Sequence, residues 1–284
     1  MRRLMIIALV LTFPVAFALP FLVAAPAVQE VSDRQLDWIA QKIWLNECAG
    51  KIEGLTSWNE GEEFASMGIG HFIWFPAHAK PPFQETFPDL LVYMQSRGIA
   101  IPAWIAPGEG PPRESAKLSL RSSPCACPWA SREEFMASQQ DKKMLELRQF
   151  LYETRRLQAA FIVRRLAEAM PRLLANAPES DRKRIERQYV RLANEPMGLY
   201  AMLDYVNFKG EGAASKERYR GKGWGLLQVL LEMPEPAGHS TAIADFVATA
   251  GQVLERRVAN SPPERREGRW LKGWRNRLNT YLEH

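Results

Sequence analysis

One glycine-containing segment, residues 51–70, interrupts a chain that is otherwise dominated by helical periodicity. Apolar residues do not recur there at helical spacing, and a Thr-Ser-Trp-Asn run lies among the glycines. Such a pattern is typical of turns and short strands, so we expect a small hairpin sheet in this segment. A mostly helical body with one early β-rich patch corresponds to an α+β fold with segregated elements.

The segment before it, residues 32–47, is predicted to form a helix packed on the core. Ser32 is suited to the N-cap, and Gln35 three residues later would complete a capping box. Apolar residues recur at helical spacing, and Gly50 lies where a helix stop is expected. Glu47 therefore falls in the last turn. The negative end of the helix dipole and apolar neighbours are expected there to favour the protonated carboxyl.

Most of the chain after residue 87 also has helical patterns. The expected helices cover residues 88–97, 131–175, 180–194, 195–206, 225–231, 241–258 and 270–282. Residues predicted to face the core in the longest of these are Met144, Leu147, Leu151, Phe161, Leu166, Met170 and Leu173. A Pro/Ser/Gly-rich connection, residues 102–130, is expected to be a lid or a surface excursion. We interpret residues 28–284 as a single domain with a helical insertion around residues 100–195.

Residues 1–27 have the composition of an export signal. Arg2 and Arg3 precede an apolar run that is followed by small residues suited to cleavage. The run is nearly long enough to span a bilayer, so an uncleaved membrane anchor is the alternative. In either case we expect the body to be exported and to act in the periplasm. The sequence does not indicate an oligomer.

Composition and charge limit the classes of function. The formal charge is +5, and residues 1–27 contribute two arginines and no acid, which leaves +3 for the body. That charge is too small to indicate a nucleic-acid binder, and it suits an anionic cell-wall polymer or an ordinary surface. No metal or cofactor is expected, because the three cysteines and four histidines lack paired ligand spacing. A disulfide from Cys48 to Cys125 or Cys127 would suit an oxidising compartment.

Several carboxylates close together in the early segment suggest acid–base chemistry. Glycoside hydrolysis needs one protonated carboxyl to donate to the leaving oxygen and one ionised carboxylate to activate water or stabilise positive charge. Glu47, at the end of an apolar helix, is a candidate for the acid. Glu60, Glu62 and Glu63 lie in a polar, turn-rich stretch and are candidates for the ionised partner.

The order of these residues resembles that of phage-type lysozymes. In that family a glutamate follows the first helix, and an aromatic-x-aspartate element and a Thr-Ile-Gly-Tyr-Gly-His string come next. Here Trp58-Asn59-Glu60 resembles the aromatic-x-acid element, and the string Ser66 to His71, SMGIGH, resembles the second motif. The resemblance implies a lysozyme-like fold in which Glu60 replaces the aspartate and Ser66 replaces the threonine that helps to hold the water.

The resemblance leaves two candidates for the acid. Glu53-Gly54-Leu55 matches the family's Glu-Gly-Leu, with two residues too few before the aromatic. Glu47 matches the position after the helix, with four residues too many. The helix stop at Gly50 favours Glu47, and Glu53 remains the alternative.

Two later segments extend the resemblance. Residues 223–228, GWGLLQ, resemble the Gly-Leu-Met-Gln string of lytic transglycosylases, which share the lysozyme-like fold. Residues 270–277 resemble the C-terminal segment of phage lysozymes. The mixed run from Asp204 to Glu211 is either a cleft wall or a turn with a salt bridge. Residues predicted to bind substrate are Trp58, His71, Asn207, Glu211 and Gln228, although His71 and Trp58 also suit purely structural roles.

These features predict an exported enzyme that cleaves the glycan strands of peptidoglycan, with no nucleic-acid partner. In the hydrolytic version Glu47 is the general acid, and Glu60 and Ser66 position the water. In a lytic transglycosylase Glu47 acts alone, as acid and then as base, while the muramic 6-hydroxyl attacks. A non-catalytic glycan-binding protein of the envelope is the third possibility.

Overall fold

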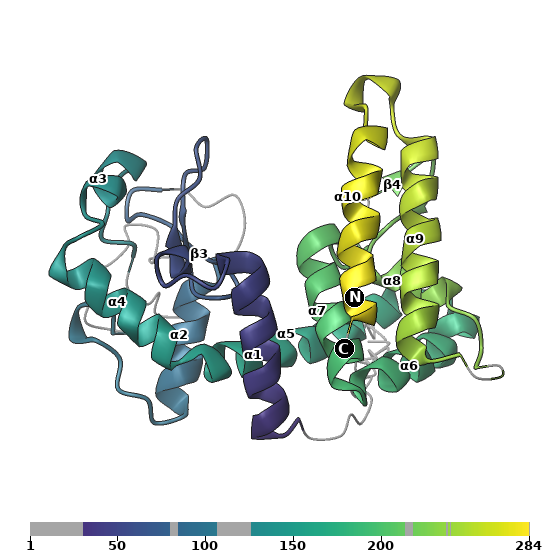
Figure 1. Cartoon of the computed structure of the whole chain (residues 1–284), viewed down its shortest axis with the longest axis horizontal. Helices are drawn as coiled ribbons and strands as arrows, with labels where there is room; N and C mark the ends of the chain where they lie inside the picture. The colour runs from purple at the N-terminus through teal and green to yellow at the C-terminus, as the bar shows by residue number, and fades with distance from the viewer. Residues whose placement is uncertain are drawn as a thin grey trace, which may run out of the picture.

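The computed structural model describes residues 31–79, 85–106, 126–213, 218–236, 238 and 240–283. These residues are mostly helical, with a three-stranded antiparallel sheet near the start, which confirms the predicted α+β class. They form a sheet-containing lobe and a helical lobe (Figure 1). Two central helices, α1 (Asp33–Cys48) and α5 (Arg155–Ala175), pack along each other, and α5 contacts elements of both lobes.

The sheet-containing lobe includes the predicted hairpin segment. Its strands are β1 (Thr56–Ser57), β2 (Ala65–Met67) and β3 (Phe72–Trp74), paired in that order. Its helices are α2 (Phe87–Ser96), α3 (Arg132–Ala137) and α4 (Lys142–Glu153), with short 3-10 turns η1 (Glu53–Leu55) and η2 (Ala103–Ile105). The buried Arg148 of α4 donates to the Thr56 hydroxyl at 2.8 Å, which fixes the sheet against this helix.

The helical lobe is built around α7 (Pro196–Lys209), which is buried along most of its length. Around it lie α6 (Glu179–Ala193), α8 (Leu226–Glu232), α9 (Ala242–Asn260) and α10 (Gly268–Asn279). A two-stranded ribbon, β4 (Arg218–Tyr219) and β5 (Lys222–Gly223), and the turns η4 (Pro263–Arg265) and η5 (Thr280–Leu282) complete the lobe. An apolar helix with neighbours on most sides is the arrangement expected for a fully buried helix.

The first helix has the predicted start and stop. The Ser32 hydroxyl accepts from the Gln35 amide at 3.3 Å, and the Gln35 side chain accepts from the Ser32 amide at 2.9 Å. The helix ends at Cys48 because Ala49 and Gly50 both adopt left-handed backbone angles, with φ of 52° and 65°. Glu47 therefore lies in the last turn, and Glu53 lies beyond the helix in η1.

The single helical pattern predicted over residues 131–175 is divided into α3, α4 and α5. The first break follows Ser138, and the second falls at Thr154, whose hydroxyl donates back to the Phe150 carbonyl at 2.7 Å. A hydroxyl that bonds to the carbonyl four residues earlier weakens or bends a helix. The apolar spacing continues across Thr154, so the sequence pattern does not reveal this break. All seven residues predicted to face the core from this region are buried. The range expected as an insertion thus includes α5, which packs along α1.

The disulfide predicted for Cys48 is wrong, because Cys48 is a buried free thiol. Its sulfur points to the Gly68 carbonyl, 4.0 Å away, inside the core. Cys127 is held elsewhere, because its backbone amide donates to the Phe75 carbonyl at 3.0 Å beyond the end of β3. Burial, and secondarily the neighbouring Glu47, raises the pKa of the Cys48 thiol to about 12, so this thiol stays protonated at neutral pH.

Two sequence predictions lie outside the described residues. These are the N-terminal signal or anchor at residues 1–27 and the larger part of the connection at residues 102–130. In the part of the chain that the structure describes, no helix has the length and apolar character needed to cross a membrane.

A buried lysine stands out in the packing of the helical lobe. Lys209, at the end of α7, is only 8% exposed, and its ammonium lies 3.2 Å from the centre of the Trp274 ring. Burial, with a further contribution from Arg257, lowers the pKa of Lys209 to about 7. Glu267 opposes this effect, and it also accepts two hydrogen bonds from Arg257 at 2.7 and 2.9 Å.

This environment predicts a pH-dependent stability. The folded-state pKa of Lys209 is below its ordinary value of 10.5, so the unfolded chain binds this proton more readily between about pH 7 and pH 10. The free energy of unfolding should therefore rise with pH across that window, by at most about 1.4 kcal/mol per pH unit. Relative to Lys209→Met, wild type should gain stability in urea unfolding between about pH 7 and pH 9. The exposed-lysine control Lys142→Met should run parallel to wild type. If Lys209→Met also runs parallel, the lysine is not buried as described.

Candidate active site between the two lobes

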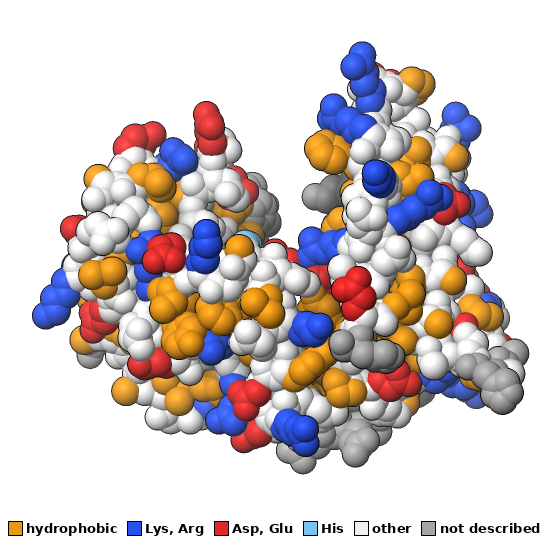
Figure 2. All heavy atoms as spheres, viewed as in Figure 1, with side chains coloured by type: hydrophobic (Ala, Val, Ile, Leu, Met, Phe, Trp, Pro, Cys, Tyr) orange, Lys and Arg blue, Asp and Glu red, His pale blue; other side chains and the backbone are white. Residues whose placement is uncertain are grey.

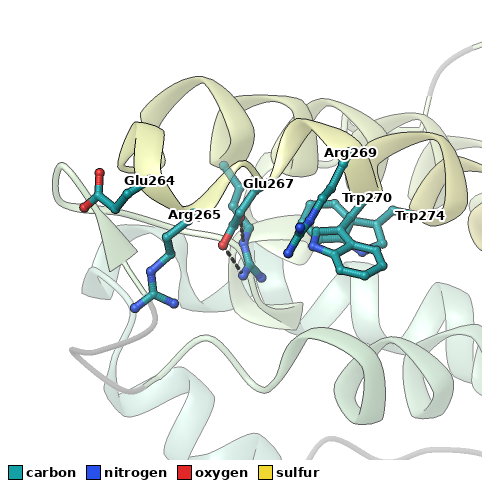
Figure 3. A pocket seen from close by; sticks show the side chains of 7 residues that line it. Glu264, Arg265, Glu267, Arg269, Trp270 and Trp274 are labelled. Carbon is teal, nitrogen blue, oxygen red and sulfur yellow. Dashed lines mark hydrogen bonds and ion pairs between the residues drawn. The ribbon is translucent and has the colours of Figure 1, made fainter.

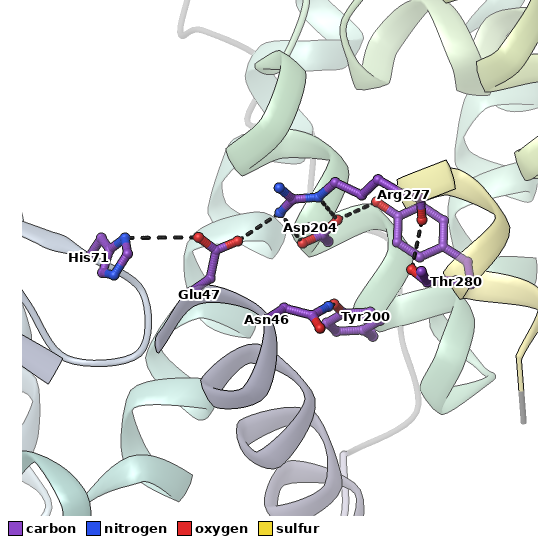
Figure 4. A network of polar contacts seen from close by, with 8 residues as sticks. Asn46, Glu47, His71, Tyr200, Asp204, Arg277 and Thr280 are labelled. Atoms are coloured by element: carbon purple, nitrogen blue, oxygen red, sulfur yellow. Dashed lines mark hydrogen bonds and ion pairs between the residues drawn. The ribbon is translucent and has the colours of Figure 1, made fainter. Parts of the chain in front are cut away.

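A deep notch separates the two lobes on the face shown in Figure 2. Glu47, at the end of α1, lies where elements of both lobes meet. Its carboxylate contacts Arg277 of α10 on one side and His71 of the β2–β3 turn on the other (Figure 4). One side chain from each lobe thus approaches the predicted acid.

The surroundings of Glu47 are charged and polar rather than apolar. Arg277 Nη2 donates to Glu47 Oε1 at 2.7 Å, and His71 Nδ1 lies 3.8 Å from Oε2. The side chain is 23% exposed, so it remains accessible to solvent. The expectation of apolar neighbours is therefore wrong. The apolar periodicity of the sequence indicated which face of α1 packs on the core. It did not indicate that α10 approaches the end of this helix, where Glu47 lies.

Arg277 is held mainly by Asp204 of α7. Its Nε donates to Asp204 Oδ2 at 2.7 Å and its Nη2 donates to Oδ1 at 2.5 Å, a two-pronged pair on a carboxylate that is only 4% exposed. Tyr281 donates its hydroxyl proton to the same carboxylate. Hydrogen bonds to Asp204 raise the pKa of Arg277 above its usual range, with Glu47 adding to the effect. Arg277 is consequently a fixed positive charge next to Glu47.

The residue next to Glu47 ties the end of α1 to the helical lobe. Asn46 donates a hydrogen bond to the Tyr200 hydroxyl of α7. The Tyr200 ring packs edge-on against the Tyr281 ring with centres 6.0 Å apart. Burial is the main cause that raises the pKa of both tyrosines, so both hydroxyls remain protonated at neutral pH. These contacts limit the positions that the Glu47 backbone can adopt.

The turn that carries His71 is fixed from below by α5. Gln158, which is fully buried, accepts from the Ile69 amide at 2.8 Å. Gly68 has a φ of 70°, and a Cβ at that position would lie 2.2 Å from Gln158 Oε1, so both the conformation and the contact require glycine. His71 itself has a φ of 45°, an uncommon angle that helps to direct its ring to Glu47.

Two predicted substrate-binding residues line a small hollow that borders this turn at Gly70. The hollow measures about 110 Å³, and Gly70 and Phe72 form its wall on the sheet side. Asn207 and Glu211 line it from the helical lobe, and Glu211 pairs with Arg172 of α5 at 2.9 Å. The run from Asp204 to Glu211 is therefore not a turn, because it is helical through Lys209, but it does include a salt bridge and it lines this hollow.

Three other predicted catalytic residues lie apart from Glu47. Glu60 is exposed in the turn between β1 and β2, and Glu53 is exposed in η1. Ser66 is buried in β2, opposite Ser57 and Ile73. All these positions lie within the described ranges, and none of the three makes a hydrogen bond or ion pair with Glu47.

Two predicted substrate-binding side chains are engaged in internal contacts. The Trp58 ring is 5% exposed, packs on Phe135 with ring centres 5.8 Å apart, and donates its N–H to the Glu62 carbonyl at 2.7 Å. Gln228 is 9% exposed, accepts from the Gly225 amide at 2.9 Å and donates to the Gly212 carbonyl at 3.2 Å. Trp58 packs the sheet-containing lobe, and Gln228 shapes the start of α8.

Asp204 and Arg277 were not predicted as site residues. Asp204 had a recognisable signal, because it is the one acid in the apolar run of α7 and a buried carboxylate requires a partner. Arg277 had no comparable signal, since it is one of several cations in the last helix. For a metal, the described residues provide no group of three His, Cys, Asp or Glu side chains placed to hold one.

No protein-family model, no curated protein and no solved structure matches this chain. The chemical interpretation of the site therefore depends on its own geometry and on the motifs in the sequence.

The Asp204–Arg277 pair gives a test of this geometry. Asp204→Asn should lower the free energy of unfolding by about 3 kcal/mol, because breaking a buried ion pair leaves a charge without its main partner. Urea or thermal unfolding measures this loss. Glu255→Gln is the matched control, because Glu255 of α9 pairs at 2.7 Å on the exposed surface with Arg275 of α10, the helix that also carries Arg277. Its cost should be at most about 1 kcal/mol. Equal costs for the two variants would show that Asp204 is not a buried anchor.

Proposed function

We propose that the protein cleaves the glycan strands of peptidoglycan, with Glu47 donating a proton to the oxygen between N-acetylmuramic acid and N-acetylglucosamine. The observation that carries the proposal is the position of Glu47. It is a partly exposed carboxylate at the end of a core-packed helix, between two lobes, and it is contacted by one side chain from each lobe. General acid catalysis requires a carboxyl held at one place within reach of the substrate.

The shared arginine is compatible with proton transfer at Glu47. Asp204 occupies both Nε and Nη2 of Arg277, so the arginine keeps two hydrogen bonds when Glu47 is protonated or turns to a ligand. On return to the carboxylate form, Glu47 regains a charged partner 2.7 Å away. Asn207 and Glu211 add an amide and a carboxylate between the lobes, groups able to hydrogen-bond N-acetyl and hydroxyl substituents.

Two reaction types share this acid. In hydrolysis Glu60 and Ser66 would position the attacking water. In lytic transglycosylation Glu47 gives its proton to the leaving oxygen, then accepts the proton of the muramic 6-hydroxyl as that oxygen bonds to the anomeric carbon. Transglycosylation needs one carboxylate, whereas hydrolysis also needs Glu60 at the separation of roughly 5–9.5 Å that catalytic carboxyl pairs have. Peptidoglycan lies outside the inner membrane, so the proposal includes export of the body through residues 1–27.

The role of Glu47 is tested by clearing of a peptidoglycan zymogram. Glu47→Gln should reduce clearing by at least about 100-fold, because a general acid typically contributes 10²–10⁴ in rate. Glu53→Gln should clear like wild type, which separates the two candidate acids. Glu63→Gln is the matched control, since Glu63 is an exposed carboxylate in the turn-rich segment.

Clearing by Glu47→Gln at the wild-type rate would contradict the acid assignment. Loss of clearing in Glu53→Gln alone would transfer the role to that residue. Binding of glycan strands by a wild-type protein that clears nothing would support the non-catalytic alternative.

The reaction type is tested by the mass of the released fragments. Transglycosylation leaves a 1,6-anhydro end one water lighter than the hydrolytic product, and Glu60→Gln should leave its rate unchanged within about twofold, since such an exposed carboxylate takes no part. Fragments that carry the added water, together with a loss of about 100-fold or more in Glu60→Gln, would instead establish hydrolysis with Glu60 as partner.

A further inference from the structure

The end of the helical lobe at the α9–α10 connection has a cluster of exposed cations, which we call the basic tip. Its members come from the β4–β5 ribbon and from η4 and the start of α10; they are Arg218, Arg220, Lys222, Arg265, Arg266 and Arg269. Tyr219 of the ribbon donates to Glu267 at 2.8 Å, which places the ribbon against this end of α10. Figure 2 shows Lys and Arg side chains gathered over the upper part of this lobe.

The acids that the structure describes in this region are fewer than the cations of the cluster. Glu267 is buried and is paired with Arg257, which leaves Glu264 as the exposed acid of residues 262–269. Among the residues that the structure describes, Arg265, Arg266 and Arg269 form no ion pair with an acid. Like charges held close together repel one another, so this arrangement does not serve folding stability. An anionic partner would account for it.

A hollow of about 500 Å³ opens within the basic tip (Figure 3). Arg265 and Arg269 flank it, and Trp270 and Trp274 form its aromatic wall. The Arg269 guanidinium lies 4.8 Å from the centre of the Trp270 ring, and Trp270 is 52% exposed. A large aromatic side chain left half in solvent beside cations is therefore part of the same surface.

The deeper part of the hollow is fixed by internal contacts. Arg257 lies 5.1 Å from the centre of the Trp274 ring, and Lys209 lies 3.2 Å from it on the side of α7. The pair of Arg257 with Glu267 neutralises one cation inside the lobe. The floor is thus preorganised, whereas the rim carries Arg265 and Arg269, which pair with no acid of the described residues, together with the exposed Glu264.

We infer that the basic tip binds the anionic headgroups of a phospholipid membrane. Clusters of four to eight cations bind anionic lipid surfaces, and each cation contributes severalfold in affinity. Tryptophan rings reside preferentially at the headgroup level, with one edge apolar and the N–H in water. The hollow between Arg265 and Arg269 is suited to a headgroup phosphate, beside which Trp270 reaches the acyl boundary. The α9–α10 connection projects from the lobe, so a flat surface has access to it (Figure 1).

The test is co-sedimentation of the full chain with two kinds of vesicle, phosphatidylcholine alone and phosphatidylcholine with about 30% phosphatidylglycerol. The ratio of the two affinities removes the contribution of the apolar segment at residues 4–23, which is the same in every variant. Arg265→Gln/Arg269→Gln should lower the anionic-over-neutral ratio about 20-fold. Arg156→Gln/Arg164→Gln removes the same charge from exposed positions of α5 and should retain the wild-type ratio.

A second readout concerns the tryptophan. Brominated lipids quench tryptophan fluorescence on contact. Trp270→Ala should lose that quenching, measured with vesicles to which the variant can still bind. Equal ratios in the tip and control variants would overturn the proposal, as would a wild-type ratio near one. Preferential binding of a soluble polyanion such as a DNA oligonucleotide, lost in the same tip variant while the vesicle ratio is unchanged, would show that the partner is not a membrane.

Discussion

The arrangement of the two lobes at the candidate site depends on Arg277. Its guanidinium bonds to the buried Asp204 on α7 and to Glu47 at the end of α1, and it thereby connects three helices from distant parts of the chain. The charges form a chain in which a buried acid fixes a cation and the cation fixes a partly exposed acid. A charge pair with one desolvated member is sensitive to geometry, so the position of α10, which packs on α9 and is joined to α7 by the Arg277–Asp204 pair, determines where Glu47 points.

The local signals of the sequence were sufficient for the elements nearest to the site. Ser32, Gln35 and Gly50 defined α1 to within a residue, because caps act on neighbouring backbone groups. The sheet was predicted from the turn residues of the segment 51–70, and its third strand, β3, lies just beyond that segment. The division of residues 131–175 was missed because the apolar spacing continues across Thr154.

The contacts of the site depended on tertiary structure and were harder to predict. Nothing in the order of residues connects Glu47 with Arg277, which is 230 positions away. Cys48 had the loop length for a disulfide, yet the core places its sulfur against the Gly68 carbonyl. Trp58 suited a sugar platform by motif, and packing on Phe135 buries it. In each case, contacts with residues far away in the sequence decided which of the interpretations allowed by the local pattern is correct.

We propose that a glycan strand lies between the lobes with its scissile bond at Glu47. A crystal structure of the Glu47→Gln variant with a bound peptidoglycan oligosaccharide tests it most directly. We expect a glycosidic oxygen within about 3 Å of the side chain at position 47, with Asn207 or Glu211 in hydrogen-bond contact with the sugars. A strand bound away from the notch, or a glycosidic oxygen nearest to Glu53 or Glu60, would contradict it.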